Sequence, residues 1–228
     1  MKKIITYTLL IVTIVLSTMF LVSKTNTNNF NRGKIITHKT IIKKPKKVKV
    51  VKVPENIIYI QPLGDVNNDY VIKVKAAIED FYKTKCVVKG KIEFTDDILA
   101  KSKTRYDADK ILSKFNSKEN QLFLTEKDIA CKAEDRHSNE WGIFGLGYRP
   151  GSTCIVSTFR LKKNVSDNTV IERLIKISLH EVGHNLGLGH CTNNENCMMN
   201  DADGTITQVD REWVWLCYKC QNFLKTKK

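Results

Sequence analysis

The stretch HEVGHNLGLGHC, residues 180–191, holds three of the protein's five histidines and one glutamate, followed directly by a cysteine. His180 and His184 are four residues apart and project from one face if the segment is helical. Gly187 fits the end of such a helix, where a residue with positive φ is common. The chain would then turn back and bring His190 toward the first two histidines. The spacing therefore predicts that three imidazoles meet at one point.

The residues before this stretch predict the helix itself. Asn168 is a suitable N-cap, and the helical spacing of apolar residues continues to Leu186. The predicted core face consists of Val170, Ile171, Leu174, Ile175, Leu179, Val182 and Leu186.

Three neutral imidazoles are a typical ligand set for a catalytic zinc. Zinc binds histidine nitrogen at about 2.0–2.1 Å, and three protein ligands leave a fourth position open for water. The pKa of that water falls to about 7. Glu181 lies about 100° around the helix from His180, so we expect it to take the proton of the zinc-bound water rather than bind the ion. The alternative is that the histidines are hydrogen-bonded core residues.

The cysteine that ends the stretch belongs to a second predicted site. Cys191 and Cys197 are followed by the pair Cys217 and Cys220, whose spacing is typical of zinc ligands. Four thiolates would hold a structural zinc with Zn–S distances of about 2.3 Å and tie the His190 segment to the C-terminus. Two disulfides are the alternative in an oxidising compartment. The remaining cysteines, for which burial or one disulfide is expected, are Cys86, Cys131 and Cys154.

The whole pattern resembles the archaemetzincins, a family of metzincin-type zinc peptidases. It reads HExxHxxGxxHC over residues 180–191, then CxM over 197–199, then seventeen residues and CxxC over 217–220. The resemblance implies that Met199 is the methionine of the turn beneath the catalytic zinc. It also implies that the four cysteines bind a second zinc and that the family domain covers residues 55–228. One departure is that five residues, rather than the expected four, separate the first two cysteines.

Alternating strand and helix patterns predict an α/β (α+β) fold. We expect a metzincin-like zincin with a mixed twisted sheet, packed helices, an active-site helix and a small C-terminal subdomain held by zinc. By the resemblance, residues 154–161 form the edge strand above the cleft, where an extended substrate would add; the alternative is a strand with a purely structural place in the sheet. Residues 131–141 read as a charged loop, and Trp213 and Trp215 as core of a terminal helix. The expected strands are 56–60, 86–94, 121–125, 142–147 and 154–159, and the expected helices are 69–84, 107–115 and 168–186.

The net charge of +14 would suggest a nucleic-acid partner, but its distribution argues against one. Residues 1–54 hold 12 of the 38 Lys and Arg and no acid, which leaves 26 against 24 acids in residues 55–228. The predicted domain is therefore nearly neutral, and no nucleic-acid binding is expected.

The basic N-terminal part divides into two segments. Residues 4–22 are apolar without a charge after two lysines, which predicts a signal peptide or membrane anchor over residues 1–23. Residues 24–54 read as a basic linker that is either a solvated spacer or a contact to a membrane or another anionic surface. We therefore expect an exported or membrane-anchored protein, with its orientation undecided.

Taken together, the residues predict a zinc metallopeptidase that acts as a monomer on peptide or protein substrates. Glu181 would be its catalytic residue, and it would carry two zinc ions, one catalytic and one structural. The alternatives are a non-catalytic binding module stabilised by zinc and a hydrolase of a non-peptide amide. The intact Glu181 beside an open zinc argues against the binding module.

Overall fold

The computed structural model describes residues 57–134 and 137–226. The predicted signal peptide or anchor at residues 1–23 and the basic linker at residues 24–54 lie outside the described residues. Within the part described, no helix combines the length and the hydropathy that a membrane crossing requires.

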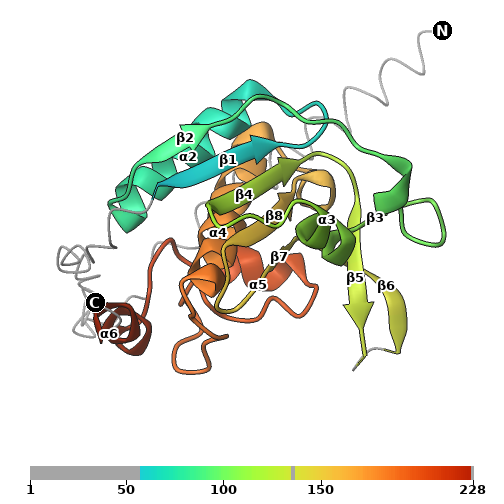
Figure 1. The fold of residues 1–228 in the computed structure, drawn as a ribbon. Coiled ribbons are helices and arrows are strands. Elements are labelled where there is room, and N and C mark those ends of the chain that lie inside the picture. The colour runs from blue at the N-terminus through green and yellow to red at the C-terminus, as the bar shows by residue number, and fades with distance from the viewer. Residues whose placement is uncertain (1–56, 135–136, 227–228) are drawn as a thin grey trace, which may run out of the picture. The chain divides into compact units, whose positions relative to one another are not determined.

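A five-stranded sheet forms the centre of the domain (Figure 1). The strand order is β2 (Cys86–Val88), β1 (Ile58–Pro62), β4 (Asn120–Thr125), β8 (Thr153–Ser157) and β7 (Gly145–Gly147). The first four strands are parallel to their neighbours, whereas β7 runs antiparallel to β8. This arrangement confirms the predicted mixed sheet.

The position of β8 corrects one prediction. The segment 154–161 was expected to be the edge strand over the cleft, but β8 pairs with β4 on one side and with β7 on the other. Its last predicted residues form instead the short 3₁₀ helix η2 (Phe159–Leu161). Which strand lies at the edge of a sheet depends on the pairing of segments that are distant in sequence. A local sequence pattern does not encode that pairing. The edge strand on this side is β7.

A second, three-stranded sheet contains β3 (Tyr106–Asp107), β5 (Ile129–Ala133) and β6 (Ser138–Ile143). The strands β5 and β6 form an antiparallel hairpin from the segment expected to be a charged loop. The strand expected at 142–147 is divided between the end of β6 and β7. The charged residues around the hairpin turn hide the alternation that marks a strand.

Helices cover both faces of the five-stranded sheet. The helices α2 (Asn68–Tyr82) and α4 (Asp167–Asn185) pack against each other and against one face. The helix α3 (Ala108–Lys114) packs against the other face, and η1 (Asp96–Ile98) precedes it.

The core follows the alternation of side chains along the strands. In β4, Leu122 and Leu124 are buried among the residues of α2 and α4. Phe123 lies between them in sequence but is buried on the opposite face with Ile111 of α3. The predicted sheet with helices packed on it is therefore confirmed, with a hydrophobic core on each face.

The helix α4 carries the motif and is held at both ends. Its N-cap is Ser166, whose hydroxyl accepts a hydrogen bond from the backbone N–H of Thr169, two residues before the predicted cap. The helix ends as predicted, and Gly187 has a φ of 95°. An L side chain is disfavoured at that φ, so glycine suits the turn that redirects the chain after α4.

Two short helices, α5 (Ile206–Arg211) and α6 (Tyr218–Thr226), form the C-terminal part of the domain. The segment between them is not helical, which corrects the terminal helix predicted over Trp213 and Trp215, although Trp215 packs against the core as expected. Trp213 is 57% exposed. The segment bends at Val214 before it reaches the cysteine pair.

Candidate active site

The three histidines of the motif converge on one point. His180 and His184 come from α4, and the turn after the helix brings His190 beside them, with ring centroids 4.6–5.5 Å apart. The Nε2 atoms of His184 and His190 are 3.2 Å apart, and one ring nitrogen from each histidine lies within 4.8 Å of the others. Tetrahedral Zn–N bonds of about 2.0–2.1 Å separate two nitrogens by about 3.4 Å. The three rings therefore fit zinc.

Backbone carbonyls orient the two ligands on the helix. His180 donates from Nδ1 to the carbonyl of Met198 at 2.7 Å, and His184 donates from Nδ1 to the carbonyl of Leu188 at 2.8 Å. Because a carbonyl only accepts, the proton sits on Nδ1 and the lone pair on Nε2. Burial lowers the pKa of His180 to about 3 and also lowers that of His184. Both rings are thus neutral at neutral pH, as a metal ligand must be.

A carboxylate orients the third ligand. The Nδ1 atom of His190 lies 3.2 Å from Oδ2 of Asp201, and the His190 side chain is 45% exposed. A carboxylate behind a ligating imidazole fixes its tautomer and raises its basicity. Sequence reasoning missed Asp201. Its position two residues after Met199, in the acidic run Asp201–Asp203, was the available signal.

Glu181 lies against the edge strand, with its carboxylate beside Gly145 and Gly147 of β7. A Cβ atom built on Gly145 would be 2.6 Å from Oε1 of Glu181, and one on Gly147 would be 3.1 Å from Oε2. Glu181 is only 6% exposed, and burial, reinforced by the charge of Asp201, raises its pKa to about 8. A nearby cation would act in the opposite direction and favour the carboxylate.

The histidines and Glu181 open into one cavity of about 400 Å³, called here the active-site cavity. β7 forms one wall, and the segment after Met199 forms part of another. The charged residues that line it besides the motif are Arg149 and three acids, Asp201, Asp203 and Glu212. None of these four was predicted from the sequence, because none belongs to a local motif.

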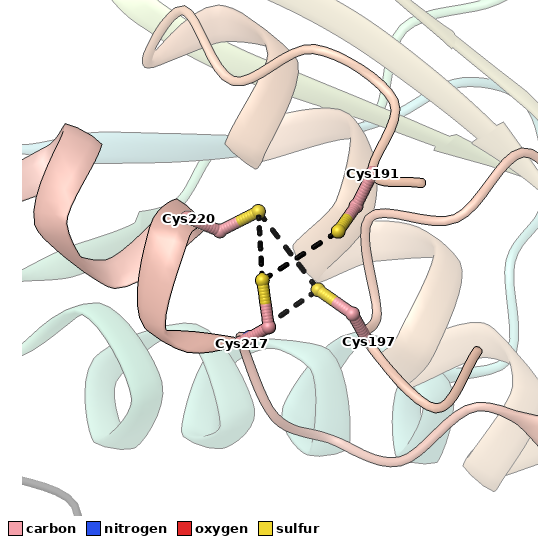
Figure 2. A group of neighbouring side chains, drawn as sticks. All are labelled: Cys191, Cys197, Cys217 and Cys220. Carbon is pink, nitrogen blue, oxygen red and sulfur yellow. Dashed lines mark hydrogen bonds between the residues drawn. The ribbon is translucent and has the colours of Figure 1, made fainter. Parts of the chain in front are cut away.

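The four cysteines form a second cluster, shown in Figure 2. The sulfur–sulfur distances are 3.5 Å for Cys191 and Cys217, 3.7 Å for Cys217 and Cys220, and 3.9 Å for Cys197 and Cys220. A disulfide would require about 2.05 Å. The edge of a tetrahedron of sulfurs around zinc, at Zn–S of about 2.3 Å, is about 3.8 Å. The cluster thus has the dimensions of a zinc site rather than of two disulfides.

The thiols of this cluster share protons unequally. The hydrogen bond between the Cys197 and Cys220 thiols, the largest influence, lowers the pKa of Cys197 to about 5. The same contact raises the pKa of Cys220. A group of thiols that already favours one thiolate is suited to bind a cation.

Short backbone links connect the two clusters. The N–H of Met198 donates to the carbonyl of Trp215 at 2.9 Å, and the carbonyl of the same Met198 accepts from His180. The N–H of Cys191 donates to the carbonyl of Met199 at 2.6 Å. The segment between the cysteines therefore touches the histidine ligands directly.

Met199 is fully buried. Its Sδ would lie 2.7 Å from a Cβ on Gly183, which precedes His184 in α4. The absence of a side chain at Gly183 allows the methionine to approach the helix backbone. The methionine therefore lies against the helix backbone between His180 and His184, and its role in a turn beneath the zinc stays a prediction.

Comparison with known proteins gives one consistent result. The sequence profile of peptidase family M54 matches residues 46–226. An archaemetzincin of Halobacterium salinarum is 30% identical over 173 residues, which cover 71% of this chain and 95% of the relative. The crystal structure of an archaemetzincin of Archaeoglobus fulgidus, complexed with malonate, has a TM-score of 0.64 and 30% identity and covers 73% of this chain and 99% of that chain. An archaemetzincin structure from Methanopyrus kandleri has a TM-score of 0.63 at 23% identity and covers 78% of this chain and 100% of that chain, which supports the fold.

Proposed function

The chain belongs to peptidase family M54, the archaemetzincins, and is a zinc metallopeptidase, and from this premise we propose that it cleaves peptide bonds with Glu181 as the general base. In this proposal His180, His184 and His190 hold the catalytic zinc. The four cysteines hold a second, structural zinc. The observation that carries the proposal is that three converging imidazoles and one buried carboxylate share a single cavity.

Zinc held by the three histidines would supply a Lewis acid that polarises the peptide carbonyl and makes the attacking water more acidic. Glu181 takes a proton from the attacking water and later delivers it to the leaving amine. β7 holds the carboxylate in place, because the backbone at Gly145 and Gly147 lies directly against it. The burial of Glu181 excludes bulk water, which would otherwise compete for the same proton.

The outer edge of β7 is the proposed position of the substrate backbone. Within the described residues, β7 pairs with β8 on one side only. An extended peptide would add to the free edge by backbone hydrogen bonds, as other peptides add to exposed sheet edges. Its carbonyl groups would then pass across the active-site cavity beside Glu181. This assignment replaces the one based on β8.

Replacement of Glu181 by glutamine tests the proposed base. The amide keeps the shape of the side chain but cannot accept the proton, so we expect kcat to fall by about 10²- to 10⁴-fold. Zinc content, measured by elemental analysis, should stay at the wild-type value. Glu195→Gln, at an exposed carboxylate in the loop between Cys191 and Cys197, is the matched control and should keep full activity. Full activity in Glu181→Gln would exclude the mechanism.

The proposed structural zinc is tested by its stoichiometry. Wild type should contain two zinc ions per chain, and the double variant Cys217→Ser, Cys220→Ser should contain one. The double variant should also unfold at lower urea concentration, because the metal contributes to folding where its ligands form only in the native state. Cys131→Ser, outside both clusters, should keep two ions. An unchanged stoichiometry in the double variant would contradict the proposal.

We also propose that residues 1–23 direct export or anchor the protein in a membrane, that the basic segment 24–54 contacts an anionic surface, and that the peptidase acts as a monomer. The sequence pattern of the N-terminal residues supports the first two statements. Cell fractionation of the full chain and of a variant that lacks residues 1–23 tests them. Equal distribution of the two proteins between membrane and soluble fractions would contradict the anchor.

A further inference from the structure

The active-site cavity extends beyond the catalytic groups to a region that the proposed chemistry leaves unused. Ile177, which lies four residues before Glu181 on the same face of α4, lines the cavity, and four residues correspond to about 6 Å along the helix axis. Glu212, which follows α5, lines it too. The helix α5 contacts α4 beside Ile177, because the ammonium of Lys176 donates to the carbonyl of Val209, so Ile177 and Glu212 define one end of the cavity. This end of the cavity therefore lies within reach of a side chain that flanks the cleaved bond.

Glu212 is a buried carboxyl group without a cationic partner. It is only 2% exposed, and its Oε1 atom accepts a hydrogen bond from Nε2 of Gln208 at 3.3 Å. Among the described residues, no basic nitrogen lies within 4.0 Å of its carboxylate. The ammonium of Lys176 instead pairs with Glu172 at 2.9 Å and donates to a backbone carbonyl. A buried charge in a cleft that lacks a partner in its own chain is typical of a binding site.

The surroundings of Glu212 in the cavity are largely apolar. Ile177, Trp141, Phe144 and Ala202 contribute to the walls. The indole of Trp141 also lies close to Gly204, where a Cβ would be 3.0 Å from Cζ2. Apolar walls with one carboxylate match a side chain that has an aliphatic stem and a charged end.

The other charges of the cavity are mostly acidic. Asp201 and Asp203 line the cavity together with Glu212, and Asp201 also lies against His190. Arg149 lies beside the turn that carries His190, where its Nη1 atom would be 2.6 Å from a Cβ on Gly189. Burial raises the pKa of Glu212 to about 7 although the charge of Lys176 acts in the opposite direction, and a bound cation would favour the ionised form of Glu212.

We propose that this end of the cavity binds a lysine or arginine side chain next to the scissile bond, and that Glu212 accepts the hydrogen bonds of its cation. The preferred substrates are therefore peptides with a basic residue at one position beside the cleaved bond. This inference rests on the proposed peptidase function and names the substrate class of that same site. Glu212 acts on specificity and takes no part in the proton transfer by Glu181.

Four peptides that differ at one position test the inference. They carry lysine, arginine, norleucine or glutamate beside the bond that mass spectrometry identifies as cleaved, and the full zinc-loaded chain is assayed. Norleucine keeps the aliphatic stem of lysine without its charge. We expect kcat/KM to be about 10- to 100-fold higher for lysine than for norleucine, with most of the difference in KM. The glutamate peptide should be the poorest substrate.

Glu212→Gln should remove the preference for lysine over norleucine, whereas the control Glu195→Gln should keep it. The ratio of the two kcat/KM values is the readout, because it cancels a general loss of active enzyme. Equal kcat/KM values for lysine and norleucine in wild type, or a lysine preference that persists in Glu212→Gln, would overturn the inference.

A binding measurement separates this inference from the proposed function. Fluorescence anisotropy of the labelled lysine and norleucine peptides with Glu181→Gln measures peptide binding in the absence of hydrolysis. If wild type cleaves no peptide, the proposed function fails. The role of Glu212 is then still decided by binding. Glu181→Gln should bind the lysine peptide more tightly than the norleucine peptide, and the double variant Glu181→Gln, Glu212→Gln should lose this preference. Equal binding of both peptides would overturn it.

Discussion

Gly145 lies in β7 directly against the carboxylate of Glu181, and Gly145→Ala is expected to disable the proposed base while leaving the three histidines in place. The added Cβ would lie 2.6, 2.7 and 2.9 Å from Oε1, Cγ and Cδ of Glu181, whereas ordinary contacts begin at 3.4 Å. Either the carboxylate or the strand must therefore move by about 0.8 Å. A displacement of about 1 Å of a catalytic group costs about 10²-fold in rate. We expect kcat to fall by about 10- to 100-fold at unchanged zinc content.

The same overlap should reduce stability. Overpacking costs about 1–3 kcal/mol of stability. In a domain of this size, each kcal/mol lowers Tm by about 2–4 °C. Glu181→Ala removes the atoms that the new methyl group meets. In that background Gly145→Ala should therefore cost much less, which gives a coupling energy of about 1–2 kcal/mol in a double-mutant cycle.

Gly90→Ala is the matched control, because a Cβ at Gly90 has no heavy atom within 4 Å. It should leave both kcat and Tm at wild-type values. Activity and Tm at wild-type values in Gly145→Ala would refute the contact between β7 and the base. Loss of zinc together with activity would indicate that the ligands, rather than Glu181, had moved.

Three further predictions concern stability, and urea unfolding measures each of them. Tyr82→Phe removes a buried hydrogen bond of 2.6 Å to the carbonyl of Leu179 and should cost about 1–2 kcal/mol; an unchanged midpoint would contradict this. Folding raises the pKa of Glu212 from 4.5 to about 7, so its ionisation opposes folding as pH rises through this window. Glu212→Gln should thus be more stable than wild type by about 1–2 kcal/mol at pH 8, and this difference in stability should narrow toward pH 5. A difference that stays the same at both pH values would exclude destabilisation by the ionised Glu212. Asp128 accepts hydrogen bonds from two arginines, including Arg160 at 2.7 Å. Asp128→Asn should therefore cost about 2–3 kcal/mol of stability. Wild-type stability in this variant would contradict the role of Asp128.

The parts of the fold that were predictable are those with a local signal. The helix α4 was predicted within two residues at each end, because its apolar period, its capping region and Gly187 all lie within the segment itself. The convergence of the three histidines also follows from one helix and one turn. The cysteine cluster was predictable because each pair keeps a short spacing and the family resemblance joined the pairs.

The features that were not predictable depend on contacts between distant segments. The edge position of β7 follows from its pairing with β8, and the three-residue strand is too short to show a period. The contact of Gly145 with Glu181 joins positions that no motif relates. Glu212 looks in sequence like any surface acid after a short helix. Only the folded chain shows that it is buried in the cavity wall.

The cysteine cluster and the histidine site behave as one mechanical unit because the same backbone atoms serve both. Met198 donates its N–H to Trp215, two residues before Cys217, and accepts the Nδ1 proton of His180 with its carbonyl. Cys191 follows the third ligand directly. A displacement of either cysteine segment therefore shifts the orientation of a histidine on the helix as well as the position of His190. If the proposed structural zinc is bound, it would therefore hold the segment that carries His190, whose side chain is 45% exposed.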